Sequence, residues 1–74
     1  MQEIKVGTLI IQKRDFGGHD LGIVIHVDEK SMDLVTGEAI EVFWFDYKIS
    51  FFYSLRDINW FLIGTEESLW KIIN

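Results

Sequence analysis

Few side chains in this sequence could ligate a metal ion, and they do not converge. The chain contains two histidines and no cysteine. His19 and Asp20 are adjacent in a polar segment, whereas His26 and Asp28 alternate with apolar residues farther along the chain. A metal site needs three or four ligands that meet at one point, and this spacing does not place the two groups on one face. The sequence therefore predicts no metal site and no cofactor.

Residues for covalent or acid–base catalysis are also missing. No serine or threonine lies in a strand-to-helix elbow, and the lack of cysteine removes another common nucleophile. The Glu66-Glu67 pair is explained by the preference for acidic residues in the first turn of a helix. Gly17-Gly18 lacks the Lys-Ser/Thr pair that follows a phosphate-binding loop, so we expect a turn there. We predict that the protein is not an enzyme and has no small-molecule substrate.

The charge balance disfavours nucleic acid as a partner. The chain has a net charge of −5, with twelve acidic and seven basic residues, and only Lys13 and Arg14 are adjacent among the basic ones. Phosphate contacts need clustered lysine and arginine. An acidic chain could instead bind a basic protein surface. Its acidic pairs, Asp28-Glu29 and Glu66-Glu67, are short for an inhibitor that imitates nucleic acid.

The length and hydropathy pattern predict one small domain over residues 1–74. No apolar run approaches the roughly 20 residues that span a bilayer. The segment Met1–Lys5 lacks the basic and apolar regions of a signal peptide. We therefore expect a cytoplasmic protein with no membrane partner.

Alternating apolar residues predict five short strands. We expect these strands at 6–13, 21–28, 40–45, 49–55 and 60–63, with loops at 14–20 and 29–38 and a helical turn at 55–58. In the second strand, one face would carry Leu21, Ile23, Ile25 and Val27, and we expect the other, with Gly22, Val24, His26 and Asp28, to point outward. The tail 65–74 has Thr65 as a possible cap and Lys71 near its end, which favours a short helix. The same tail residues also fit a sixth strand.

Aromatic residues concentrate in the third and fourth strands. Seven of the eleven aromatic residues lie between Phe43 and Tyr53, which predicts a β-hairpin with aromatic side chains on both faces. A loop at 46–49 would pair Phe45 with Ser50 and Trp44 with Phe51. The first face then carries Ile40, Val42, Trp44, Phe51, Tyr53 and Leu55, and the second carries Glu41, Phe43, Phe45, Ser50, Phe52 and Ser54.

The polar residues of the second face mark it as outward, which leaves three phenylalanines to explain. A sheet needs only one apolar face to form a core, so something must cover Phe43, Phe45 and Phe52. Either the tail covers them, through Leu69, Trp70 or Ile73, or a protein partner does. We predict a partner-binding surface that consists of Phe43, Phe45, Phe52, Tyr47, Trp60 and Trp70.

The order of these elements resembles an all-β, five-stranded SH3-like barrel with a short C-terminal helix. The segments Lys5–Ile10 and Leu21–Ile25, with Gly18 between them, are similar to the KOW pattern, and Val42–Asp46 is similar to a strand of small phage-encoded SH3-like proteins. The resemblance covers residues 4–63 as the barrel and leaves 65–74 as the helical tail. It implies a location in the host cytoplasm or the virion.

Two departures limit what the resemblance implies about binding. KOW proteins that contact RNA usually carry basic residues in the first loop, but Arg14–Asp20 is close to neutral. Proline-peptide binders of the SH3 type use a tyrosine-rich groove. Asp15, Phe16, Asp20 and Trp60 sit in corresponding places here, but the tyrosines are missing.

We therefore expect a protein–protein interaction or assembly module that binds a protein partner or itself as a homo-oligomer. The alternatives are an acidic inhibitor of a host nucleic-acid-processing protein and a KOW-like module associated with RNA or the ribosome.

Overall fold

The computed structural model describes residues 4–30, 37–62 and 69–73. These residues form the strands β1 (Leu9–Lys13), β2 (His19–Val27), β3 (Ile40–Trp44), β4 (Ile49–Tyr53) and β5 (Trp70–Ile73), and the helix α2 (Leu55–Leu62). All neighbouring strands are antiparallel, in the order β4-β3-β2-β1-β5. The fold is therefore all-β, as predicted, with one short helix among the described residues. Its described strands form one open sheet with β4 and β5 at the edges, whereas the sequence predicted a barrel.

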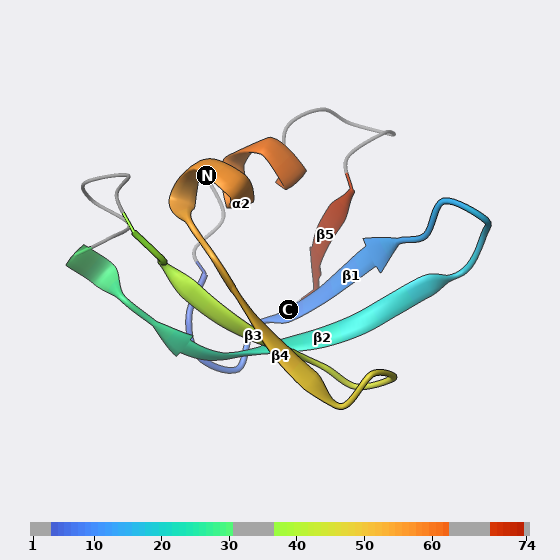
Figure 1. Cartoon of the computed structure of the whole chain (residues 1–74), viewed down its shortest axis with the longest axis horizontal. Helices are drawn as coiled ribbons and strands as arrows, with labels where there is room; N and C mark the ends of the chain where they lie inside the picture. The colour runs from blue at the N-terminus through green and yellow to red at the C-terminus, as the bar shows by residue number, and fades with distance from the viewer. Residues whose placement is uncertain (1–3, 31–36, 63–68, 74) are drawn as a thin grey trace.

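The core lies between the bowed sheet and α2, which sits over the concave face (Figure 1). Cross-strand neighbours Ile10, Gly22 and Trp44 share this face, as do Val24 and Val42. The helix adds the buried Ile58, with Leu55, Phe61 and Leu62 packed beside it. The fully or almost fully buried apolar residues are Ile4, Ile10, Val24, Ala39, Ile40, Val42, Trp44, Ile58 and Trp70.

Strand β2 presents the opposite face from the one expected. Gly22 and Val24 are buried, whereas Leu21 and Ile25 are exposed. The reason is space: a Cβ atom at Gly22 would lie 2.7 Å from Cε3 of Trp44, so only glycine fits beneath that indole ring. A bulge at Ile25 shifts the register between Val24 and His26. This bulge lets Val27, three residues after Val24, also pack against the core.

The C-terminal third contains the main errors of the sequence prediction. Helix α2 replaces both the single helical turn and the strand expected at 60–63, because Ser54 caps a full helix. Its Oγ accepts a hydrogen bond from the Asp57 backbone N–H at 3.2 Å. The expected tail helix is also wrong over Trp70–Ile73, which forms β5 against β1. Thr65, Glu66 and Glu67 lie outside the described residues.

The β3–β4 hairpin has the predicted faces but a different register. Trp44 pairs with Ile49 and Val42 with Phe51, a shift of two residues from the expected pairs. A two-residue shift preserves the side-chain alternation, so the face assignment is confirmed. The loop is one residue earlier than expected, at 45–48, and Lys48 adopts a φ of 55° at its end. The turn expected at Gly17-Gly18 is confirmed, since both glycines have positive φ.

Trp70 is the central side chain of the core. Its ring lies 4.8 Å from the ring centroids of Tyr53 and Phe61 and 5.9 Å from that of Trp44. Its Nε1 donates a hydrogen bond to Oε1 of Gln12 at 2.8 Å, so the buried indole leaves no unsatisfied donor. One residue thus joins β5, β1, β4, β3 and α2.

Tyr53 is the core's polar neighbour. Its hydroxyl accepts a hydrogen bond from Nε1 of Trp44 at 3.0 Å. Burial raises the pKa of the Tyr53 phenol by more than this hydrogen bond lowers it, and the nearby Asp57 carboxylate raises the pKa further.

No helix within the described part of the chain is long and apolar enough to cross a bilayer.

We expect Trp70→Ala to lower the free energy of unfolding by about 3–5 kcal/mol, because it leaves a large cavity under β5. A loss of that size would leave little stability in so small a domain. Trp60→Ala is the matched control: Trp60 is 73% exposed on α2, and we expect a change within about 0.5 kcal/mol. Urea denaturation followed by circular dichroism measures both. Equal effects of the two variants would contradict this packing.

The raised Tyr53 pKa predicts a loss of stability at alkaline pH. In the unfolded chain the phenol ionises near pH 10, whereas the folded chain retains the proton to higher pH. This contribution is therefore complete below about pH 10 and is lost as the pH rises through the folded-state value. Tyr47→Phe leaves Tyr53 as the single tyrosine, so near-ultraviolet absorbance reports its titration alone. Identical titration curves with and without urea would contradict the prediction.

Candidate functional site

The sheet face that α2 does not cover carries a continuous set of apolar side chains, which we name the outer face. Cross-strand register places Leu9 between Ile23 and Ile73, and Ile23 beside Phe43. This row runs from β5 through β1 and β2 to β3 without a polar residue. The outer face consists of Leu9, Ile11, Leu21, Ile23, Phe43, Phe45, Phe52 and Ile73.

The phenylalanines give the outer face its bulk at the hairpin end. The rings of Phe43 and Phe45 meet edge to face, with centroids 5.7 Å apart. Phe43 is half-buried among its neighbours, whereas Phe45 is 41% and Phe52 is 53% exposed. Together they leave a ridge of aromatic carbon in contact with solvent.

Polar groups lie at the margins of this face. Ser50 donates a hydrogen bond from its Oγ to Oε2 of Glu41 at 2.6 Å, which ties β4 to β3 beside Phe52. Lys71 pairs with Ile11 at the opposite edge, on β5. An apolar centre with a polar margin is the usual composition of a protein interface.

The predicted site residues separate into three groups. Phe43, Phe45 and Phe52 lie on the outer face. Tyr47 lies in the β3–β4 turn and lines a groove, while Trp60 is exposed on α2, the helix that covers the other face of the sheet. Trp70 is 1% exposed, so its assignment to a partner-binding surface conflicts with its place in the core.

Sequence reasoning missed the aliphatic half of the outer face. Leu21 and Ile23 were expected to point into the core, because their alternation was read with apolar residues inward. The signal that could have identified them is Gly22. A glycine within a strand often marks a close approach by a large side chain of the neighbouring strand, here Trp44, and so indicates the face that points into the core. Ile73 was missed because the tail was expected to be helical.

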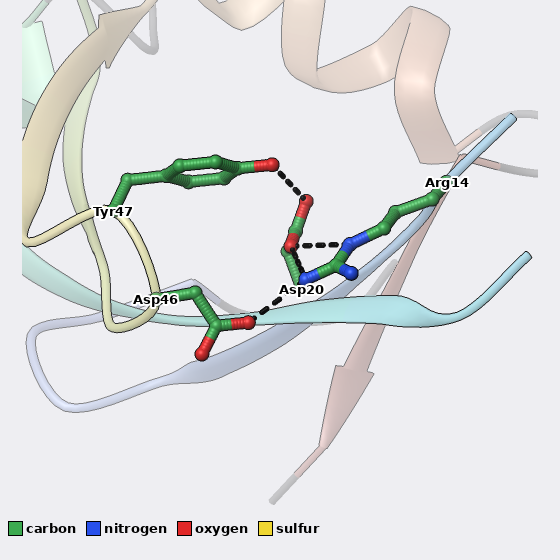
Figure 2. A network of polar contacts seen from close by, with 4 residues as sticks. All are labelled: Arg14, Asp20, Asp46 and Tyr47. Carbon is green, nitrogen blue, oxygen red and sulfur yellow. Dashed lines mark hydrogen bonds and ion pairs between the residues drawn. The ribbon is translucent and has the colours of Figure 1, made fainter. Parts of the chain in front are cut away.

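A second feature is an open groove of about 710 Å³ between the β1–β2 loop and the β3–β4 turn. Its lining residues include Gln12, Arg14, Phe16, Asp20, Tyr47 and Phe61. Figure 2 shows a polar network that includes three of these lining residues, in which Arg14 lies between the carboxylates of Asp20 and Asp46. Phe16, at the tip of the β1–β2 loop, is fully exposed.

Asp20 is the buried member of this network and is fully bonded. Arg14 Nε donates to its Oδ1 at 2.7 Å, and the Tyr47 hydroxyl donates to its Oδ2 at 3.3 Å. Nη2 of Arg14 contacts Asp20 Oδ1 as well, and it donates an exposed hydrogen bond to Asp46 Oδ2 at 2.8 Å. The hydrogen bond and the charge of Asp20 raise the pKa of Arg14. The network fastens the β3–β4 turn to β1 and β2, so its carboxylates already have partners within the chain.

The histidines lie on β2, and both are exposed. Within residues 4–30, 37–62 and 69–73, no three histidine, aspartate or glutamate side chains gather as metal ligands.

No protein-family model, curated protein or solved structure matches the chain significantly. Function is therefore inferred from the geometry of the chain itself.

We expect Tyr47→Phe to lower the free energy of unfolding by about 1 kcal/mol, because it removes one hydrogen bond to a buried carboxylate that keeps its arginine. Phe16→Ala is the control at the same groove, and we expect a change within about 0.5 kcal/mol because that ring is fully exposed. Urea denaturation measures both variants. If the Tyr47→Phe variant were as stable as the parent, the hydrogen bond from the Tyr47 hydroxyl to Asp20 would make no contribution to the stability of the fold.

Proposed function

We propose that this protein is a non-enzymatic protein-interaction or assembly module that binds a protein partner through its outer face. The observation that carries the proposal is the unbroken apolar row from Ile73 through Leu9 and Ile23 to Phe43. Burying such a row gives a favourable free energy of association in proportion to the apolar area removed from water. Large contiguous apolar patches are uncommon on the free surface of monomers.

The strand arrangement supports a relationship to SH3-like folds as part of the same proposal. A meander of four strands is followed by a helical segment, and the last strand returns to pair with β1. The sequence resemblance also put a helical turn between the fourth and fifth strands, although it expected that fifth strand at 60–63 and a helix after it. In this protein the helical segment is a full helix, α2, and it covers one face of the sheet (Figure 1). The proposed binding surface is the other face.

The outer face also distinguishes this proposal from an acidic inhibitor. Asp20 and Asp46 are bonded to Arg14, and Glu41 accepts from Ser50. Because these carboxylates have partners within the chain, apolar contact supports docking better than charge does. Binding through the outer face should depend little on salt, whereas binding through carboxylates should weaken as salt rises.

Photocrosslinking tests which side of the protein is occupied. A benzophenone amino acid in place of Phe45 should give protein adducts of defined mass in the producing cell, because that ring lies on the outer face. The same probe in place of Trp60 is the control, since Trp60 is an even more exposed aromatic residue and lies on α2. Adducts from position 60 but not from position 45 would contradict the proposal.

A second substitution checks that the adduct reports a specific contact. Phe43→Ser in the chain that carries the probe at Phe45 should reduce the adduct yield about tenfold, as expected for the loss of one buried aromatic side chain from an interface. Near-ultraviolet circular dichroism verifies that the variant remains folded. An undiminished yield would show that the contact does not involve this face.

A further inference from the structure

Strand β4 differs from the other edge strand in the residues that it carries. Its sequence, Ile49–Tyr53, contains no charged residue and no proline, whereas β5 carries Lys71 near its middle. Natural sheets usually blunt an exposed edge with charge, proline or a bulge, because a bare edge recruits further strands. β4 has none of these devices.

Apolar side chains on both faces of β4 are also exposed. Ile49 and Phe51 pair with the buried Trp44 and Val42 on the concave face, yet they remain 48% and 49% exposed. Phe52 is exposed on the outer face. Ile49 and Phe51 thus keep about half of their surface accessible, whereas Tyr53 on the same face packs against Trp70 and Phe61. A neighbouring strand with apolar residues on both faces would cover Ile49, Phe51 and Phe52.

The backbone of β4 is available on the same side. The Tyr53 carbonyl accepts a hydrogen bond from the Ala39 N–H at 2.7 Å, so the backbone groups of Tyr53 face the inner side of the hairpin. Backbone direction alternates along a strand, so Phe51 and Ile49 also face β3. The N–H and C=O groups of Ser50 and Phe52 therefore point away from the sheet.

We propose that β4 pairs antiparallel with β4 of a second copy of this chain, across a two-fold axis at Phe51. The outward groups of Ser50 then meet those of Phe52 in the other copy, and the reverse pair is identical by symmetry. About four backbone hydrogen bonds form. Phe51 lies opposite Phe51 of the other copy, and Ile49 lies opposite Tyr53, so all five β4 residues are paired.

Charge also favours this register. Lys48 of one copy then lies opposite Ser54 of the other copy. The Asp57 carboxylate is next to Ser54, since its Oδ2 accepts a hydrogen bond from the Ser54 N–H at 3.5 Å. The lysine therefore approaches a carboxylate at each end of the paired strands. A shift of two residues in either direction would leave part of β4 unpaired and separate these charges. A second copy of the chain would therefore supply hydrogen-bond partners for the β4 backbone, apolar cover for its side chains and a carboxylate near Lys48.

This inference does not depend on the outer-face proposal, because it concerns the edge of the sheet. Solution mass by light scattering, over a range of concentrations, should show the 8.7 kDa chain in equilibrium with a dimer. Ser50→Pro should raise the dimer dissociation constant by roughly 100-fold, since proline removes an outward N–H and blocks the approach of the second strand. Ser50→Ala is the matched control, because it also loses the Glu41 hydrogen bond but keeps the N–H.

Charge exchange at the symmetry axis gives a test that does not rest on proline. Phe51→Lys and Phe51→Glu should each be monomeric, because like charges would lie directly opposite one another. An equimolar mixture of the two variants should form a heterodimer. Circular dichroism verifies that each variant is folded before its mass is measured.

Three results would overturn the pairing. These are a parent chain that remains monomeric at every concentration, a Ser50→Pro chain that associates as strongly as Ser50→Ala, and a mixture of the charged variants that remains monomeric. A dimer in solution without crosslinks from position 45 would refute the proposed function alone. Crosslinks from position 45 on a chain that stays monomeric would refute the strand pairing alone.

Discussion

The burial of Trp70 is the constraint on which the rest of this structure depends. Its indole ring fills the space between the bowed sheet and α2 and touches the aromatic rings of Trp44, Tyr53 and Phe61. Trp70 packs against Trp44, and Trp44 in turn fits on the concave face because the facing residue of β2 is Gly22, where a Cβ atom would lie 2.7 Å from Cε3 of Trp44. In a chain of 74 residues the hydrophobic core is small, so one large side chain carries a considerable share of the apolar burial.

The requirement for that space determines which face of β2 points outward, and this explains what the sequence could and could not predict. The local alternation in β3 and β4 was sufficient to assign their faces, because Glu41 and Ser50 marked the outward side. In β2 both alternating sets contain apolar residues, so periodicity alone is ambiguous. The choice depends on a contact between Gly22 and a tryptophan 22 positions later in the chain, which no local pattern contains.

The C-terminal segment shows the same dependence on distant contacts. The residues around Trp70 fit a helix or a strand equally well by composition, and pairing with β1 decides between them. Helix α2 is different, because its cap at Ser54 and the Asp57 three residues later form a local signal that sequence reasoning could have used. The groove network was also out of reach, since Arg14 and Asp46 meet only after the sheet has formed.

The distribution of charge connects the fold to assembly. The chain has a net charge of −5, which opposes nonspecific aggregation. Among the described residues, most charged side chains lie outside the strands, whose interiors remain almost uncharged. Of the two sheet edges, β5 carries Lys71 and β4 carries no charge. If β4 paired with β4 of a second copy across a two-fold axis, β5, which carries Lys71, would be the sheet edge left exposed in each copy. The assembly would then stop at two copies. An open sheet with one protected and one unprotected edge therefore suits a closed assembly better than a fibre.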